Sequence, residues 1–596
     1  MNVKMSVEMN NDISKPEQLI TEHIDIWTRA ILAKSTSGRG SNKKYELYGI
    51  TKLRELILEL AVRGKLVPQD ADDEPASVLL EKIAAEKAQL IKDKKIKKTK
   101  ADSEVNEDEK LFELPSNWQW TRLNLITEIN PRNTDVDDKT KVSFVPMTLI
   151  TTSYDGVHGS ESRPWSEIKK GYTHFANGDI AIAKITPCFE NSKAAIFRNL
   201  ENGIGAGTTE LHVARPFGEQ IERNFLLLYF KSPNFLTMGQ RLMTGSAGHK
   251  RVPRSFFESN PIPLPPLAEQ KRIVAKVDEL MLLCDQLDQQ TEASIEAHAT
   301  LVEVLLATLA DSVDADELAQ NWARISEHFD SLFTTEQSIE TLKQTMLQLA
   351  VMGKLVPQNP DDEPASVLLE SINEVQSKLV KEEGLRTSAS KELNADDKYL
   401  TQPHGWEWMR LGNLAKFIDY RGKTPTKIES GVRLITAKNI RYGYVDLKPE
   451  EFISEDEYTS WMTRGFPKQG DTLFTPEAPL GNAANIDIKG KFALAQRAIC
   501  FQWHLSGISD FLLLQILAKP FQLQLIDNAT GMTATGIKAS KLKEIPMIIP
   551  PLAEQQRIVA KVEELMAICN QLKEKLKQSQ ETQVQLTDAL IDKALG

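Results

Sequence analysis

The chain carries the sequence LRELILELAVRGKLVPQDADDEPASVLLEKI at residues 53–83 and repeats it as LKQTMLQLAVMGKLVPQNPDDEPASVLLESI at residues 342–372. A second pair of segments starts at Pro265, with PPLAEQKRIVAKVDELMLLCDQL, and at Pro550, with PPLAEQQRIVAKVEELMAICNQL. Because both pairs are displaced by almost the same number of residues, they belong to one duplicated unit. The repeat predicts an internal pseudo-two-fold duplication.

The stretches between the paired segments, about 110–264 and 399–549, resemble each other only near their edges. Residues 118–123, WQWTRL, correspond to residues 406–411, WEWMRL. A duplication without consequence for function would drift more evenly along its length. Near-identical flanks around dissimilar middles therefore indicate two copies of a scaffold that hold two modules of different specificity.

The repeated segments have the apolar spacing of helices. Apolar residues in 53–61 lie three and four apart, and Gly64 follows as a C-terminal stop. A second helix is expected after the DDEP sequence, where Asp72 or Asp73 can cap its first turn. From Ile273 and from Ile558 the apolar positions step by four and three, as a coiled-coil seam requires. We expect two helices of about 40 residues each that pair antiparallel with each other.

The middles have the pattern of β-strands, because short apolar runs such as 180–185, 193–197, 432–435 and 493–501 lie between turn-forming residues. The expected fold class is α+β, with two α/β-mixed modules separated by long antiparallel coiled-coil helices. The charged stretch 92–110 predicts a solvated linker. The expected domains are a leader without an assigned role at 1–50, a helical hairpin and the charged linker at 51–109, the first module at 110–264, a spacer helix at 265–310, a connector and the second hairpin at 311–398, the second module at 399–549 and a second spacer helix at 550–596.

The composition excludes several classes of protein. With 596 residues, of which 41% are hydrophobic and 26% charged, the chain is expected to be globular and multidomain. Its continuous apolar runs are too short to cross a membrane, and the N-terminus lacks an export signal, so we expect a cytoplasmic protein. Four cysteines without zinc-site spacing predict neither a disulfide framework nor a metal site. The net charge of −11 opposes uniform binding to phosphate and leaves local basic loops as candidates for nucleic-acid contact.

In these features the chain resembles the DNA specificity (S) subunit of type I restriction-modification systems. The resemblance rests on the doubled PPLAEQ-x-RIVAKV helices, the doubled GKLVPQ and DEPASVLLE segments and the two modules that begin at W-x-W-x-RL, and it covers the chain from about Tyr48. It implies that each module is a target recognition domain that reads one half of a split, asymmetric sequence in double-stranded DNA. The repeated helices would form a spacer that docks two methyltransferase (M) subunits, and restriction (R) motor-nuclease subunits would join them. S-adenosylmethionine, ATP and magnesium would belong to those partners, and this chain would bind no cofactor.

Motifs for catalysis are missing from the sequence. The Pro-Pro pairs at 265 and 550 follow aliphatic residues, whereas the adenine methyltransferase motif needs Asn or Asp there and an aromatic residue after the prolines. Residues 421–424, RGKT, lack the first glycine of a phosphate-binding loop, because position 417 is Phe417. The acidic run 360–363 loosely resembles a nuclease carboxylate cluster, but we expect it to stabilise a helix start. The sequence therefore predicts a chain without catalytic residues.

Loops that combine glycine, hydroxyl and basic residues predict the DNA-reading positions, because glycine lets backbone amides approach a phosphate and cationic side chains complete the contact. The turns 244–254 and 530–541 occupy corresponding places in the two modules, and a surface turn with solvated lysines is the alternative for both. Among the other loops, 130–134 offers amides suited to adenine, 184–193 has a hairpin tip as its alternative, 421–427 offers arginine for guanine, and 475–482 offers a carboxylate for cytosine. The candidate DNA-binding residues are Arg132, Asn133, Lys184, Thr186, Asn191, Thr244, Ser246, Lys250, Arg251, Arg254, Arg421, Lys423, Thr424, Lys427, Thr475, Glu477, Thr530, Thr533, Thr535, Lys538 and Lys541.

Two other functions compete with sequence reading. A self-contained, modification-dependent DNA methyltransferase or nuclease would carry its own chemistry, which the missing motifs disfavour. A purely structural helical scaffold would leave the two divergent β-rich modules unexplained.

Overall fold

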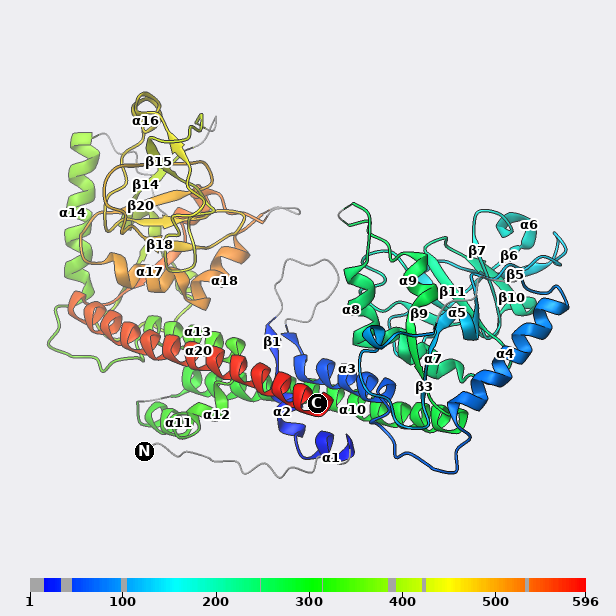
Figure 1. The fold of residues 1–596 in the computed structure, drawn as a ribbon. Coiled ribbons are helices and arrows are strands. Elements are labelled where there is room, and N and C mark those ends of the chain that lie inside the picture. Colours follow the sequence, from blue (N-terminus) through cyan, green and yellow to red (C-terminus); the bar gives the residue numbers. More distant parts are fainter. Residues whose placement is uncertain are drawn as a thin grey trace. The chain divides into compact units, whose positions relative to one another are not determined.

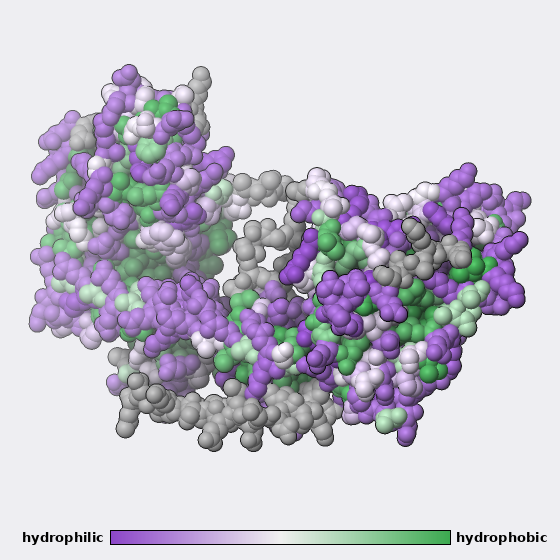
Figure 2. All heavy atoms as spheres, viewed as in Figure 1, coloured by the Kyte–Doolittle hydropathy of each residue, from purple (hydrophilic) through white to green (hydrophobic). Residues whose placement is uncertain are grey.

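The computed structural model describes the chain except for residues 1–15, 34–44, 98–103, 247, 314, 384–392, 421–424 and 531–534. The chain divides into two units, one formed by Met1–Ala293 with Ser579–Gly596 and the other by Ser294–Gln578. The two long helices, α10 (Leu267–Asp311) and α20 (Leu552–Leu595), each begin in one unit and end in the other (Figure 1). Hydrophilic residues cover much of the face drawn in Figure 2.

Each unit contains one repeated helical hairpin, formed by α3 (Tyr48–Val62) and α4 (Ala76–Lys92) in the first unit and by α13 (Glu336–Val351) and α14 (Ala365–Glu383) in the second. As predicted, α3 ends just before Gly64, and Gly353 follows α13 in the same way; both glycines have φ of +69°. A Cβ on Gly64 would lie 2.6 Å from the ring of Pro115, and one on Gly353 would lie 2.8 Å from that of Pro403. These glycines therefore end a helix and let the start of the module come close.

The predicted caps of α4 are wrong. Its N-cap residue is Pro75, and no side chain caps the helix. Asp73 instead binds Arg272 of α10 through two hydrogen bonds of 2.7 and 3.1 Å, and Asp362 binds Arg557 of α20 through bonds of 2.6 and 3.2 Å. The acidic DDEP sequence thus ties each hairpin to the start of a long helix.

The strands that open and close each module pair with each other. β3 (Gln119–Arg122) pairs antiparallel with β12 (Pro261–Leu264), and β13 (Glu407–Arg410) pairs with β21 (Pro546–Ile549). The arginine of each W-x-W-x-RL edge secures this closure, because Arg122 donates to the carbonyl of Ser259 and Arg410 to that of Glu544, both at 2.6 Å. Each module therefore enters and leaves the frame at one place.

Besides this two-stranded closure, the described residues of each module form two larger sheets, which we call inner and outer. The inner sheets, in the orders β4-β11-β8-β9 and β14-β20-β17-β18, share a hydrophobic core with helices α7 (Arg223–Lys231) and α17 (Ser509–Leu517) respectively. Their strands are β4 (Thr127–Ile129), β8 (Ile180–Ala183), β9 (Ala194–Ile196), β11 (Leu211–Pro216), β14 (Ala415–Asp419), β17 (Thr472–Phe474), β18 (Ala483–Asn485) and β20 (Ile499–Trp503).

The outer sheets have the orders β6-β5-β10-β7 and β16-β15-β19. The first has a hydrophobic cluster of its own, whereas the second shares its cluster with residues of β14, β17 and β20. Their strands are β5 (Lys141–Val145), β6 (Glu161–Pro164), β7 (Thr173–Ala176), β10 (Ile204–Gly207), β15 (Val432–Ile435), β16 (Phe452–Ile453) and β19 (Phe492–Leu494). The single strand expected at 493–501 is divided into β19 and β20 by a turn, in which Arg497 has a φ of +62°.

Smaller helices complete the modules. They are α5 (Leu123–Ile126), α6 (Trp165–Ile168), α8 (Pro233–Arg241) and α9 (Arg254–Ser259) in the first module, and α15 (Leu411–Leu414), α16 (Glu455–Trp461), α18 (Lys519–Asp527) and α19 (Ala539–Lys543) in the second. Short 3₁₀ turns are η1 (Glu107–Glu109), η2 (Met147–Leu149), η3 (Glu201–Gly203) and η4 (Ala395–Asp397).

The long helices have buried seams, as their apolar spacing predicts. In the second unit, Val302, Leu306 and Leu309 of α10 share one hydrophobic core with residues 565–576 of α20 and with α13. The late part of α10 and the early part of α20 thus lie in one core, which an antiparallel pairing requires. By length and composition alone, α10 could also cross a membrane, although the continuous apolar runs of the sequence are too short to indicate this. Its seam residues Ile273, Val277 and Cys284 are nevertheless buried within the protein.

Segments without an assigned role are partly folded onto the frame. In the leader, α1 (Pro16–Thr21), α2 (Ile24–Arg29) and the strands β1 (Leu32–Ala33) and β2 (Tyr45–Glu46) precede α3, and Trp27 is fully buried. The connector forms α11 (Ala315–Glu327) and α12 (Phe329–Leu332). Most described residues of the charged stretch 92–110 are exposed, although Ile96 packs on the core of the first module and Glu109 forms an ion pair of 2.7 Å with Arg122.

Candidate nucleic-acid interface

In the first module, the structure brings two of the predicted loops together, and we call residues 184–193 and 244–254 loop pair 1. Arg251 forms isolated β-bridges with both Ile185 and Thr244. The amide of Thr186 donates to the carbonyl of Lys250 at 3.0 Å, and the hydroxyl of Thr186 accepts from the amide of Lys250 at 3.2 Å. Of the candidate residues in this pair, Lys184 and Thr186 are half-buried and the others are exposed: Asn191, Thr244, Ser246, Lys250, Arg251 and Arg254.

Both arginines of loop pair 1 form ion pairs with carboxylates. Arg251 makes a two-pronged contact with Glu210, at 2.9 and 2.8 Å, which lowers the pKa of Glu210 and raises that of Arg251. Arg254 pairs with Glu258 at 2.5 Å. These contacts offset part of the positive charge of the loops and fix the direction of both guanidinium groups.

A buried histidine, His212, contacts the second loop of loop pair 1. His212 on β11 stacks on Phe257 with ring centroids 5.0 Å apart, and its Nε2 lies 3.1 Å from the carbonyl of Val252. Burial lowers the pKa of His212 to about 4. The imidazole is therefore neutral at physiological pH and adds no charge to the site.

In the second module, residues 475–482 and 530–541 meet in the same way, and we call them loop pair 2. Gly536 forms isolated β-bridges with Glu477 and Thr530, and the amide of Ile537 donates to the carbonyl of Pro476 at 2.9 Å. The candidate residues that the structure describes as exposed in this pair are Thr530, Thr535, Lys538 and Lys541. Thr533 lies outside the described residues.

One predicted contact in loop pair 2 is wrong. Thr475 is fully buried, and its hydroxyl accepts a hydrogen bond of 3.1 Å from the amide of Asn482. A side chain that closes its own loop in this way has no surface to offer to DNA. Thr475 therefore shapes the loop.

The charges at the two loop pairs are exchanged between the modules. Glu210 lies directly before β11, and Arg497 lies in the turn before β20. These two strands are equivalent in the two modules, because β11 pairs antiparallel with β8 and β20 pairs antiparallel with β17. Glu210 binds Arg251, whereas Arg497 binds Glu477 at 2.9 Å. Sequence reasoning missed Glu210 and Arg497, because nothing local distinguishes them from charged residues of an ordinary turn.

In the other two predicted loops, the described candidate residues have partners outside the loop pairs. Arg132 donates to the carbonyl of Tyr172 at 3.1 Å, and the side-chain amide of Asn133 donates to the carbonyl of Phe175 at 2.9 Å, so both bind the edge of the outer sheet. Lys427 pairs with Glu451 at 2.7 Å. Arg421, Lys423 and Thr424 lie outside the described residues.

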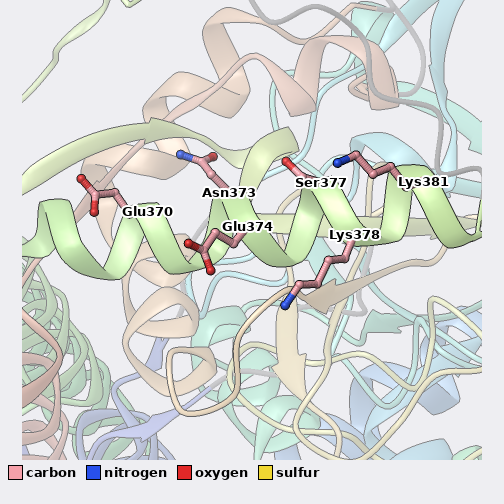
Figure 3. Close-up of a pocket in the computed structure, with 6 residues that line it drawn as sticks. All are labelled: Glu370, Asn373, Glu374, Ser377, Lys378 and Lys381. Carbon is pink, nitrogen blue, oxygen red and sulfur yellow. The ribbon is translucent and has the colours of Figure 1, made fainter.

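Two hollows in the described parts of the chain are lined mainly by helix side chains. One is lined by six residues of a single helix, and Figure 3 shows these side chains spread along α14. Another lies between α3 and the last turns of α20. Within the described residues, no three side chains among His, Cys, Asp and Glu gather where they could hold a metal ion.

Comparison with known proteins places the chain among relatives with a common architecture. A family model described as the type I restriction modification DNA specificity domain matches residues 115–297 and 403–581. The type I restriction enzyme EcoAI specificity subunit of Escherichia coli is 51% identical, over 97% of this chain and 100% of its own length. The EcoEI specificity subunit of the same species is 48% identical over the same shares.

A solved structure on complex assembly and conformational transition of the type I R-M system contains a chain that is 19% identical, with 81% of this chain and 99% of that chain covered and a TM-score of 0.48. The family model covers more than half of the residues, once in each module, and the two Escherichia coli relatives match along nearly the whole length. The chain therefore belongs to the family of DNA specificity subunits of type I restriction-modification systems.

Proposed function

We propose that this specificity subunit reads a bipartite, asymmetric DNA target, with loop pair 1 on one half and loop pair 2 on the other. The observation that carries the proposal is that both modules build the same pair of bridged loops from dissimilar residues. A shared construction supports a shared task, and dissimilar side chains at the same place support different target sequences.

Within each pair, the exposed lysines and the held charges have different tasks. Lys250, Lys538 and Lys541 approach phosphates, because flexible cationic side chains position DNA without reading it. Arg251 and the Glu477–Arg497 pair face base edges, because a charged group whose direction is fixed can discriminate between bases. Arg132 and Lys427 extend the contact outside the loop pairs. Arg421, Lys423, Thr424 and Thr533 stay predictions.

The chain supplies assembly as well as recognition. A duplicated frame presents two similar surfaces, so we infer that it binds two methyltransferase subunits, which restriction subunits then join in the cytoplasm. S-adenosylmethionine, ATP and magnesium are bound by those partners, and the specificity subunit itself catalyses no step.

A methylation assay tests this division of labour. The purified chain and the chain mixed with the methyltransferase subunit of its own operon are each given random-sequence DNA and S-adenosylmethionine. Adenine methylation at one bipartite sequence is expected only from the mixture. Methylation or cleavage by the chain alone would overturn the non-catalytic role.

Binding measurements test the two kinds of contact in loop pair 2. In the complex with the methyltransferase subunit, Lys541→Ala should weaken cognate and random DNA alike and reduce the slope of affinity against salt by about one unit. Arg497→Ala should cost roughly 1 to 3 kcal/mol on cognate DNA and much less on random DNA. Lys489→Ala, at an exposed lysine of the same module outside the loop pair, is the control. Unchanged binding for both loop variants would move the DNA surface elsewhere.

A further inference from the structure

In each module, a tight loop of the outer sheet reaches back to a helix of the frame. We call residues 150–158 and 440–445 the bracing loops. Each is closed by an isolated β-bridge, between Ile150 and His158 in the first module and between Ile440 and Val445 in the second. The sequences of the two loops are dissimilar, yet each contains a tyrosine shortly before a glycine.

The second bracing loop is fastened to two helices by one hydroxyl. The Tyr442 hydroxyl donates to the carbonyl of Leu517, the last residue of α17, and accepts a hydrogen bond of 3.0 Å from the side-chain amide of Gln344 on α13. The next residue, Gly443, donates its amide to Ala483 at the start of β18, at 2.9 Å. Through Tyr442 and Gly443, the second bracing loop thus connects the outer sheet with α17, with the inner sheet and with the hairpin helix α13.

The first bracing loop has the same connections through different residues. Tyr154 faces the carboxylate of Asp278 on α10, and burial together with that carboxylate raises the pKa of Tyr154. Gly156, at a φ of +64°, lies so close to α7 that a Cβ would be 2.6 Å from Leu227. This loop therefore also links the outer sheet to an inner-sheet helix and to a frame helix.

Both bracing loops contact the base of a reading loop. In the second module, the side-chain amide of Asn482, the last residue of the first loop of loop pair 2, donates to the carbonyl of Ile440 at 3.0 Å. In the first module, the Lys193 ammonium donates at 3.0 Å to the carbonyl of Met147 in η2, the turn that leads into the bracing loop. The Lys231 ammonium also donates to the carbonyl of Ser192 at 2.8 Å and lies 3.5 Å from that of Thr152. A continuous path of contacts thus runs from the frame helix to the reading loop.

We propose that Tyr442 is a positioning residue that holds loop pair 2 in register with the helical frame and so sharpens the rejection of wrong bases. The inference rests on the proposed function, since it assigns this tyrosine a task in reading by loop pair 2. Base discrimination needs the reading groups to be held within a fraction of an ångström, which side chains behind them must supply. A loose reading loop would still contact phosphates but would tolerate mismatched base pairs.

The test removes one hydroxyl. Tyr442→Phe keeps the ring and loses both hydrogen bonds, and Tyr444→Phe is the matched control, because Tyr444 lies in the same loop and is 61% exposed. Each variant is bound, as the complex with the methyltransferase subunit, to the cognate target and to targets with one substituted base pair in either half. The half read by the second module is assigned beforehand by exchanging residues 399–549.

The expected result is local to one half of the target. Tyr442→Phe should lower discrimination against wrong bases in the second module's half about 3- to 10-fold, which corresponds to the loss of one or two hydrogen bonds. Discrimination in the other half, and all binding by Tyr444→Phe, should match the unmodified complex. Equal weakening on matched and mismatched targets would reduce Tyr442 to a structural role and overturn the inference, as would unchanged discrimination.

A second variant keeps the inference testable if Tyr442→Phe does not fold. Gln344→Leu removes only the donor on α13 and should reduce discrimination in the same half, whereas Gln344→Lys, which keeps a donor, should restore it. Measurements on the unmodified complex distinguish failure of the proposed function from failure of the bracing role. If it does not discriminate in either half, the proposed function fails; if it discriminates and the variants do so equally well, only the bracing role fails.

Discussion

The lysine of each GKL sequence holds the end of a long helix. Lys354 donates to the carbonyls of Ala310 and Ser312 at the end of α10, at 2.7 and 2.9 Å. Lys65 donates to the carbonyl of Leu595 at the end of α20, at 2.6 Å. The last carbonyls of a helix lack partners within it and carry partial negative charge, so a cation stabilises them. This contact explains why both copies of the GKL sequence contain a lysine.

Removal of that cation should destabilise the second unit. We expect Lys354→Met to lower the free energy of unfolding by about 1 kcal/mol, because two carbonyls lose their donor while the aliphatic stem is kept. Lys378→Met, at an exposed lysine of α14, is the control and should change little. Chemical denaturation followed by circular dichroism measures both. Equal effects for the two variants would show that the contact adds nothing.

Single residues show where sequence reasoning stopped. The candidates of loop pairs 1 and 2 could be found because glycine, hydroxyl and basic residues gather in short segments. That Thr475 closes its own loop could not be found, because burial depends on the fold around a residue. The partners Glu210 and Arg497 were missed for a related reason, since each meets its ion-pair partner only across neighbouring strands.

At the scale of elements, the joint between module and frame uses a buried carboxylate. Glu554 of α20 accepts a hydrogen bond of 2.9 Å from the indole of Trp406, and burial raises the pKa of Glu554. The folded chain thus binds a proton at this site more tightly than the unfolded chain does. The contribution of Glu554 to stability is accordingly largest at low pH and falls as the pH rises above the unfolded value of 4.5.

This sign gives a testable pH dependence. The Glu554→Gln variant keeps an acceptor for Trp406 but has no charge to desolvate. From about pH 5 to about pH 7, the free energy of unfolding of the variant should therefore fall less than that of the unmodified chain. Melting temperatures across this range measure the difference. Parallel curves for the two proteins would show that Glu554 does not contribute to the pH dependence.

The elements of the frame could be predicted almost completely. Apolar spacing and Gly64 placed the hairpin, and the heptad-like seam placed both long helices. The role of the DDEP sequence was predicted wrongly, because the sequence around Asp73 does not show that Arg272 lies within reach. The strand expected at 493–501 was divided for a similar reason, since a non-glycine turn residue such as Arg497 gives no local signal.

At the scale of the whole molecule, the duplication makes the modules exchangeable. Since β3 pairs with β12, the first module enters and leaves the frame at one place, and its replacement leaves the frame closed. Exchange of residues 110–264 for the module of a relative should change one half of the methylated sequence and preserve the other. Sequencing of methylated adenines in cells that carry the chimaera measures this. A simultaneous change in both halves would contradict independent reading.

The division of α20 between the two units also has a consequence for biosynthesis. The first unit is begun first on the ribosome, yet it needs Ser579–Gly596, whereas Ser294–Gln578 is complete earlier. At the usual rate of synthesis, roughly 25 to 110 s separate the emergence of α3 from that of its last partner segment. During this interval Tyr48 of α3 and Lys65 after it lack their later partners Asp588 and Leu595. The unit that is started first is therefore completed last, when residues 579–596 emerge.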